Sequence, residues 1–89
     1  MEKEKAMKLV YFAWVRERIG ISEEEVVLPA GVHTVDDLLH WLRGRGDGYA
    51  EALQAPEVIR VAIDQEHVEH SETIDAAHEI ALFPPMTGG

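Results

Sequence analysis

The sequence predicts an α+β fold in which a mixed sheet of four to five strands carries one main helix across it. Residues 7–15 and 79–83 are the most apolar strand-like segments, as expected for neighbouring strands in the middle of a sheet. Between them, Val35, Leu38, Leu39 and Leu42 recur at the spacing of one helix face. At 89 residues the chain is long enough for one domain with a modest core.

The first strand is expected over residues 7–15, which are rich in aromatic and branched side chains. Both of its faces are apolar, so it is either covered on both sides or keeps one face for a partner. Gly20 marks a turn, and the acidic run 23–25 is interpreted as a solvated loop. A second strand is expected over residues 25–28, paired with the first as a hairpin and ended by Pro29.

The main helix begins after Thr34, with Asp37 three residues later in the pattern of an N-terminal cap. Asp36 and Asp37 lie at the positive end of the helix dipole, and Arg43 and Arg45 lie at the negative end. Glycines between residues 44 and 48 end the helix, and we interpret them as helix-ending residues rather than a phosphate-binding loop because no strand precedes them.

The second half of the chain supplies the remaining strands. Residues 49–55 predict a short helix ended by Pro56, residues 58–63 a strand, and 64–66 a turn. Val68 centres a short strand, and residues 79–83 form the last one. The compact solution for this order is a ubiquitin-like β-grasp roll. We expect a flexible extension over 1–6, the domain over 7–83 and an extended tail over 84–89.

Charge and composition exclude several classes of function. Seventeen acidic residues against eight basic ones give a net charge of −9, and Arg60 is the only lysine or arginine from Asp47 onward. Such a surface repels phosphate backbones, so the charge argues against nucleic acid as a partner and favours basic proteins. The lack of cysteine excludes disulfides and thiolate chemistry and fits the reducing cytoplasm. No apolar run approaches membrane-spanning length.

The sequence ends on Gly88-Gly89. A terminal glycine carboxylate has no side chain around it, so it can enter a narrow active site and be activated as an acyl group. A bare diglycine is better explained as a frayed end, but here Pro84 and Pro85 stiffen the base of the tail. Residues 84–89 can span roughly 20 Å. No charged side chain follows Glu79, so the tail would carry only its reacting group into a dry site.

Four stretches resemble the small subunit of molybdopterin synthase, a ubiquitin-like sulfur carrier: KLVYFA at 8–13 with Arg16-Glu17, TVDDLL at 34–39, VAIDQ at 61–65 and EIALFPPMTGG at 79–89. The Pro-Pro before the last four residues is the specific part. Two positions depart from the family pattern. Asp64 replaces the usual Asn, and the sequence DAAHE at 75–79 replaces a DGDE turn.

The resemblance implies that an E1-like adenylyltransferase uses ATP to activate the Gly89 carboxylate, and that a sulfur donor then converts it to a thiocarboxylate. Gly88 would accompany Gly89 into the active site. The sulfur acceptor would be an anionic pterin precursor, which a chain of this charge holds poorly, so the large subunit would bind it. The chain would therefore not be catalytic alone and would bind no cofactor stably.

Partner binding is expected at an apolar patch formed by Phe12 and Phe83 on the sheet face away from the helix. Plain core packing of these rings is the alternative. Arg16 is a candidate contact with a partner's acidic groups, although it can equally be solvated. The tail residues Pro84, Pro85, Met86 and Thr87 complete the expected partner-binding set.

Three other functions stay open: a thiamine-pathway sulfur carrier, a protein modifier joined to target lysines, and a binding module with an inert tail. The histidines at 67, 70 and 78 invite a metal hypothesis, but they lack helical spacing and a cysteine, so solvated surface positions are favoured. Trp14 and Trp41 are interpreted as packing residues.

Overall fold

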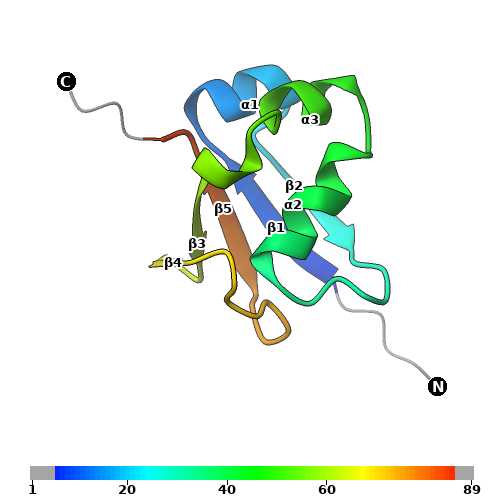
Figure 1. Ribbon diagram of the computed structural model, residues 1–89, viewed down its shortest axis with the longest axis vertical. Helices are drawn as coiled ribbons and strands as arrows, with labels where there is room; N and C mark the ends of the chain where they lie inside the picture. The colour runs from blue at the N-terminus through cyan, green and yellow to red at the C-terminus, as the bar shows by residue number, and fades with distance from the viewer. Residues whose placement is uncertain (1–5, 86–89) are drawn as a thin grey trace.

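The computed structural model describes residues 6–85 of the chain. Within them, one five-stranded sheet carries three α-helices and a short 3₁₀ helix (Figure 1). In Figure 1, α2 crosses in front of β1 and β2, and α1 lies beside α3 near the end of β5. The elements are β1 Ala6–Tyr11, α1 Ala13–Ile19, β2 Glu23–Val27, α2 Val35–Arg43, α3 Asp47–Ala52, η1 Pro56–Val58, β3 Arg60–Ile63, β4 Glu66–Val68 and β5 Glu79–Phe83.

The strand order in the sheet is β2-β1-β5-β3-β4. β1 and β5 lie side by side and run parallel, with Tyr11 opposite Leu82, whereas the other strand pairs are antiparallel. The prediction that the first and last apolar segments are central neighbours is therefore confirmed. β5 also has the predicted bounds, residues 79–83.

The hydrophobic core lies between one face of the sheet and the helices. Met7, Leu9 and Tyr11 of β1 are buried on this face, because alternate residues of a strand point to the same side. Leu38 and Leu39 of α2 pack into the same cluster and are fully buried, and each burial is worth roughly 2 kcal/mol. Val15 of α1 and Ala52 of α3 belong to it as well.

The other face of the sheet carries the alternate residues, and we call it the open face. The register places Val10, Ala81 and Ala62 in one row across its three central strands. Ala62 and Ala81 are buried but do not belong to the core cluster. Small apolar side chains therefore form the middle of the open face.

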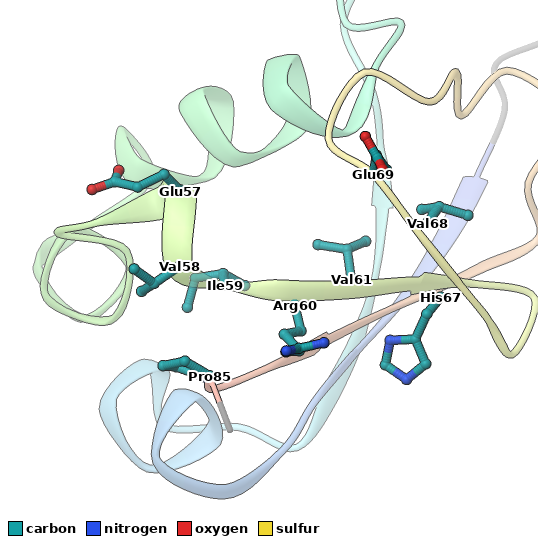
Figure 2. Close-up of a pocket in the computed structure, with 9 residues that line it drawn as sticks. All are labelled: Glu57, Val58, Ile59, Arg60, Val61, His67, Val68, Glu69 and Pro85. Atoms are coloured by element: carbon teal, nitrogen blue, oxygen red, sulfur yellow. The ribbon is translucent and has the colours of Figure 1, made fainter. Parts of the chain in front are cut away.

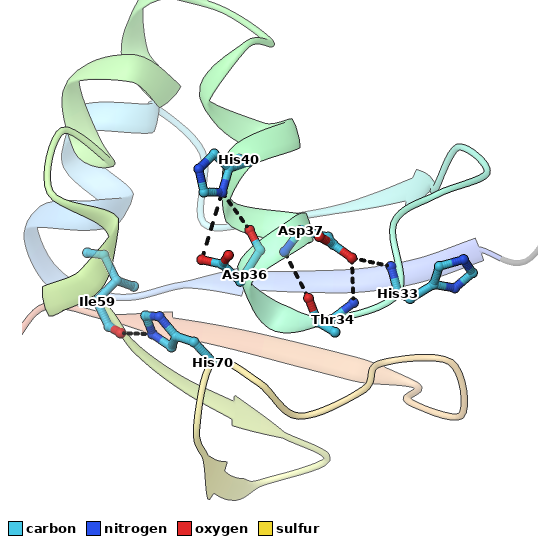
Figure 3. Close-up of polar contacts among 7 residues, drawn as sticks. All are labelled: His33, Thr34, Asp36, Asp37, His40, Ile59 and His70. Atoms are coloured by element: carbon cyan, nitrogen blue, oxygen red, sulfur yellow. Dashed lines mark hydrogen bonds and ion pairs between the residues drawn. The ribbon is translucent and has the colours of Figure 1, made fainter.

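The cap of α2 has the predicted geometry (Figure 3). The Asp37 N–H donates to Thr34 Oγ1 at 3.1 Å, and Asp37 Oδ2 accepts the Thr34 N–H at 3.2 Å and the His33 N–H at 3.0 Å. The backbone hydrogen bonds from His33 and Thr34 hold the pKa of Asp37 below its ordinary value. Both ends of this capping box satisfy amides that the first helical turn leaves free.

The prediction of one strand over residues 7–15 is wrong in its second half. β1 ends at Tyr11 and helix α1 begins at Ala13, whose φ of 54° turns the chain sharply from strand to helix. The composition suits either structure, and packing of α1 against α3 decides between them. Gly20, with a φ of 102°, caps this helix by donating its N–H to the Arg16 carbonyl, so it is not the turn of a hairpin.

The acidic run is also not a loop, because residues 23–25 lie in β2, which spans Glu23–Val27 rather than the expected 25–28. Lys8 lies opposite Glu25, and Leu9 lies opposite Glu24. Alternation therefore directs Glu24 toward the helices, whereas its two acidic neighbours occupy the open face.

The two departures from the family pattern meet at one turn. Asp64 and Gln65 have φ values of 49° and 75°, which form the tight turn between β3 and β4. Asp64 Oδ1 accepts the N–H groups of Glu79 at 2.9 Å and His78 at 3.0 Å. These backbone donors, Glu79 first, hold the pKa of Asp64 below its ordinary value. The carboxylate thus connects this turn to the start of β5.

Candidate functional site

The parallel register of β1 and β5 brings the two predicted aromatic residues together. Phe83 is the last residue of β5, and Phe12 follows β1 directly. The Phe12 N–H donates to the Leu82 carbonyl at 3.1 Å, which holds the two chain segments side by side. The rings stack with centroids 4.6 Å apart and planes within 1° of parallel.

Phe12 does not belong to the core, because 40 % of its surface is exposed and Phe83 is only half-buried. The two rings form one partly exposed aromatic patch, and its role in docking partners stays a prediction. Ala13, directly after Phe12, takes a left-handed conformation that costs a non-glycine residue about 1 kcal/mol. This turn keeps Phe12 on the surface instead of continuing the strand.

A depression of ≈ 510 Å³ surrounds the stacked rings, and we call it the aromatic depression. No carboxylate of residues 6–85 lines it, in a chain with 17 acidic residues. Pro84 and Pro85 are half-buried in its wall, so the base of the tail lies directly on this surface. The lining residues are Phe12, Ala13, Arg60, His67, Phe83, Pro84 and Pro85.

A second groove of ≈ 540 Å³ adjoins the aromatic depression and shares Arg60, His67 and Pro85 with it (Figure 2). Figure 2 shows Arg60 and His67 on one side of β3 and Val61 on the other. The additional lining residues include Glu57 and Glu69. Among residues 6–85, acidic side chains therefore line the second groove but not the aromatic depression.

Arg60 and His67 are site residues that the sequence reasoning missed. Arg60 lies opposite Phe83 in the β3–β5 register, and the His67 ring lies 5.4 Å from the Phe83 ring. The expected surface position of His67 is confirmed, but it belongs to β4 and not to a turn. The sequence contains one feature that could have indicated Arg60: it is the single lysine or arginine after residue 47.

The other predicted site residues either lie away from the aromatic depression or fall outside the described residues. Arg16 is exposed on α1 and does not line the aromatic depression. Met86, Thr87, Gly88 and Gly89 lie outside the described residues, as do residues 1–5 of the expected extension, whereas Ala6 already belongs to β1.

The histidines have local partners within the fold. His70 donates from Nε2 to the Ile59 carbonyl at 2.8 Å, and His40 Nδ1 lies 3.0 Å from the Asp36 carbonyl (Figure 3). His70 is half-buried, so it is less solvated than expected. Residues 6–85 contain no group of three or more side chains placed to hold a metal ion.

The glycine prediction holds at Gly44, which caps the end of α2, but Gly48 lies inside α3, where it has a packing role. A Cβ at this position would lie 2.6 Å from the Arg18 carbonyl oxygen, so Gly48 lets α3 approach α1 closely. Trp14 and Trp41 pack against the core as predicted. In the described part of the chain, no helix has the length and apolar character needed to cross a membrane.

Comparison with known proteins then decides the family. The model of the ThiS family matches residues 9–89. The chain belongs to the ThiS family. It is 34 % identical to the molybdopterin synthase sulfur carrier subunit of Escherichia coli K12 over 83 residues, which cover 93 % of this chain and 99 % of that protein. The resemblance drawn from residues 8–89 is therefore confirmed.

Solved structures confirm the β-grasp fold of ubiquitin-like sulfur carriers. SAMP1 from Haloferax volcanii is similar with a TM-score of 0.69 and 30 % identity, covering 96 % of this chain and all of that one. A putative molybdopterin converting factor, subunit 1, from Pyrococcus furiosus has a TM-score of 0.70 and 26 % identity, covering 91 % of this chain and 98 % of that one.

Proposed function

We propose that this ThiS-family chain is the sulfur-carrier subunit of a molybdopterin synthase. The observation that supports it best is the course of β5, which ends at Phe83 beside Phe12 and continues through Pro84 and Pro85 along the aromatic depression. A docked partner would therefore hold the base of the tail, and the diglycine end lies only a few residues farther along the chain.

The chemistry takes place at the terminal carbonyl of Gly89. An E1-like adenylyltransferase transfers AMP from ATP to the carboxylate and releases pyrophosphate, which makes the carbonyl a good acyl donor. A sulfur donor at the oxidation level of sulfide attacks this carbonyl, so that a C–S bond forms, the C–O bond to AMP breaks and a thiocarboxylate remains. Its sulfur is ionised and nucleophilic at neutral pH, so it can attack a carbon of the pterin precursor and displace an oxygen leaving group. Water then cleaves the bond between the Gly89 carbonyl and the sulfur, which leaves the sulfur on the acceptor and restores the carboxylate.

The charge of the chain indicates which subunit carries the sulfur and which subunit binds the acceptor. A net charge of −9 opposes binding of a phosphate-bearing acceptor. The large subunit would therefore supply the cationic groups that hold and activate this acceptor. This chain carries the sulfur, Met86 and Thr87 pass into the partner with Gly88, and Arg16 contacts acidic groups of the partner from α1. We place the complex in the cytoplasm.

A test of this function uses purified chain, ATP, the adenylyltransferase and a sulfur source. The intact mass should change by one oxygen replaced with one sulfur, and fragmentation should locate the change at Gly89. Deletion of Gly89 should abolish the change, whereas Glu51→Ala, an exposed substitution on α3, should leave it intact. A normal yield from the deletion variant would contradict the proposal.

A second candidate function is protein modification, which is favoured by the similarity to SAMP1 of Haloferax volcanii, a small archaeal modifier protein. The same activated Gly89 would then be attacked by lysine amines of target proteins. Proteolysed cell extracts should contain target lysines linked to a C-terminal fragment of this chain through Gly89, and these should disappear when the gene is deleted. A thiamine-pathway carrier uses the same tail with a different acceptor, so supplying each pathway's acceptor separately distinguishes these two carriers.

A further inference from the structure

Within the described part of the chain, Arg60 is a cation without a counterion on the face proposed to dock partners. It is exposed and lines both the aromatic depression and the groove beside it. No carboxylate of residues 6–85 forms an ion pair with it, although the chain is rich in acidic residues. Arg18 and Arg45, which lie over aromatic rings, are on the helical side of the molecule.

Arg60 lies where a partner docked on the stacked rings would bury it. Phe12, Phe83 and Arg60 follow one another across the open face, since Phe12 stacks on Phe83 and Phe83 lies opposite Arg60 in the sheet. A partner surface that covers the two rings must therefore also cover the guanidinium group. A buried charge without a partner is strongly unfavourable, so the covering surface must supply an acceptor.

We propose that the large subunit places a carboxylate opposite Arg60, next to the apolar pocket that receives Phe12 and Phe83. This inference rests on the proposed function, because it concerns the same docking face. A carboxylate matches the planar guanidinium with two parallel hydrogen bonds, which neutral acceptors do not provide. His67, in contact with Phe83, lies on the same side and adds no negative charge.

The overall charge of the chain attracts partners, whereas the local charge of Arg60 selects among them. The net charge of −9 draws basic surfaces in general toward this chain. At the aromatic depression, however, the local charge is positive, so a uniformly basic surface is repelled by Arg60. Only a partner that combines overall positive charge with a local carboxylate satisfies both requirements. Local charge repulsion of this kind, which weakens the binding of wrong partners, is a common source of binding specificity.

The test compares Arg60→Glu and Arg60→Gln with Arg43→Glu, and it measures affinity for the purified large subunit by calorimetry. Arg43 is exposed at the end of α2, far along the chain from β3 and β5, and its reversal changes the net charge by the same amount. We expect Arg60→Gln to weaken binding about tenfold and Arg60→Glu about a hundredfold, with less than about threefold for Arg43→Glu. Far-UV circular dichroism melts check that each variant is folded.

A rescue experiment locates the counterion. Carboxylates on the docking surface of the large subunit are replaced one at a time by arginine and tested against Arg60→Glu. One replacement should restore most of the lost affinity. The inference is overturned if none does, or if Arg60→Glu binds within about threefold of the wild type.

Phe83→Ala, measured in the same series, separates failure of this inference from failure of the proposed function. If Phe83→Ala loses affinity while Arg60→Glu does not, the docking face stands and the carboxylate is wrong. If neither variant loses affinity, the docking face itself is wrong. In either case, the mass of the Gly89 terminus reports independently on the sulfur-carrier chemistry.

Discussion

Replacement of Glu24 is the sharpest test of how β2, β1 and α3 are held together. One oxygen, Glu24 Oε2, accepts the hydroxyls of Tyr11 and Tyr49 at 2.6 Å each and Arg45 Nη1 at 3.1 Å. The Glu24 side chain is 16 % exposed, and Tyr11 is 1 % exposed. Three donors from separate elements therefore depend on a single, largely covered acceptor.

The expected magnitude follows from the exposure of each donor. In Glu24→Ala the buried Tyr11 hydroxyl loses its acceptor, which costs about 1–3 kcal/mol. Tyr49 and Arg45 are closer to solvent and can turn to water, so together they add less than about 1 kcal/mol. We therefore expect Glu24→Ala to lower the free energy of unfolding by about 2–3 kcal/mol, and Glu24→Gln, which keeps an acceptor, by about 1 kcal/mol.

The pH dependence of this effect has a definite sign. Burial raises the pKa of Glu24, but the hydrogen bonds from Tyr11 and Tyr49 and the charge of Arg45 outweigh it and hold the pKa below its ordinary value. Because the folded pKa is lower than the unfolded one, the ionised carboxylate stabilises the fold above about pH 4.3. This stabilisation is lost as the pH falls through the folded pKa, so wild type and Glu24→Gln should converge in acid.

Urea unfolding followed by the fluorescence of Trp14 and Trp41 measures these differences. Glu25→Ala is the matched control, because Glu25 is the exposed neighbour on the open face and should change stability by no more than about 0.5 kcal/mol. Equal stabilities of Glu24→Ala and Glu25→Ala would contradict the role of Glu24 as a shared acceptor. So would a difference between wild type and Glu24→Gln that persists unchanged below about pH 3.

Two further predictions concern the cap and the docking face. Thr34→Ala removes the acceptor of the Asp37 N–H and should lower the free energy of unfolding by about 1 kcal/mol. Thr73, an exposed threonine that lies opposite Thr34 in an isolated backbone bridge, caps no helix, so Thr73→Ala should cost less. Equal urea midpoints for the two variants would contradict the capping role. Phe83→Ala should weaken binding of the large subunit by about thirtyfold or more, because it removes one ring anchor and leaves Phe12 without its stacking partner. Calorimetry that shows unchanged affinity would remove the aromatic depression from the docking face.

The parts of the fold that the sequence predicts correctly are those determined by local patterns. Thr34 and Asp37 lie within one helical turn, so their capping geometry can be read from their spacing. Phe12 and Phe83 were paired by a simple topological argument, since the most apolar first and last segments become central neighbours. The chemistry proposed for Gly89 depends likewise on a short terminal motif.

The errors arise where distant residues decide the local structure. Residues 13–15 continue an apolar run whose composition suits a strand or a helix, and the packing of α1 against α3 decides for the helix. Glu24 lies in a run that is typical of a solvated loop, but its partners Tyr11 and Tyr49 are 13 and 25 positions away. Neither contact leaves a local signal. Arg60 was noticed for its charge, yet its place beside Phe83 required the β3–β5 register.

The central claim is that the terminal carbonyl of Gly89 carries sulfur. The most direct measurement is the mass of the C-terminal fragment from protein isolated out of its own cells, with the gene for the adenylyltransferase present or deleted. We expect a thiocarboxylate on Gly89 in cells that have the adenylyltransferase gene, and only a carboxylate in cells from which that gene is deleted. A terminus that is a plain carboxylate in both, while molybdopterin is still being made, would contradict it.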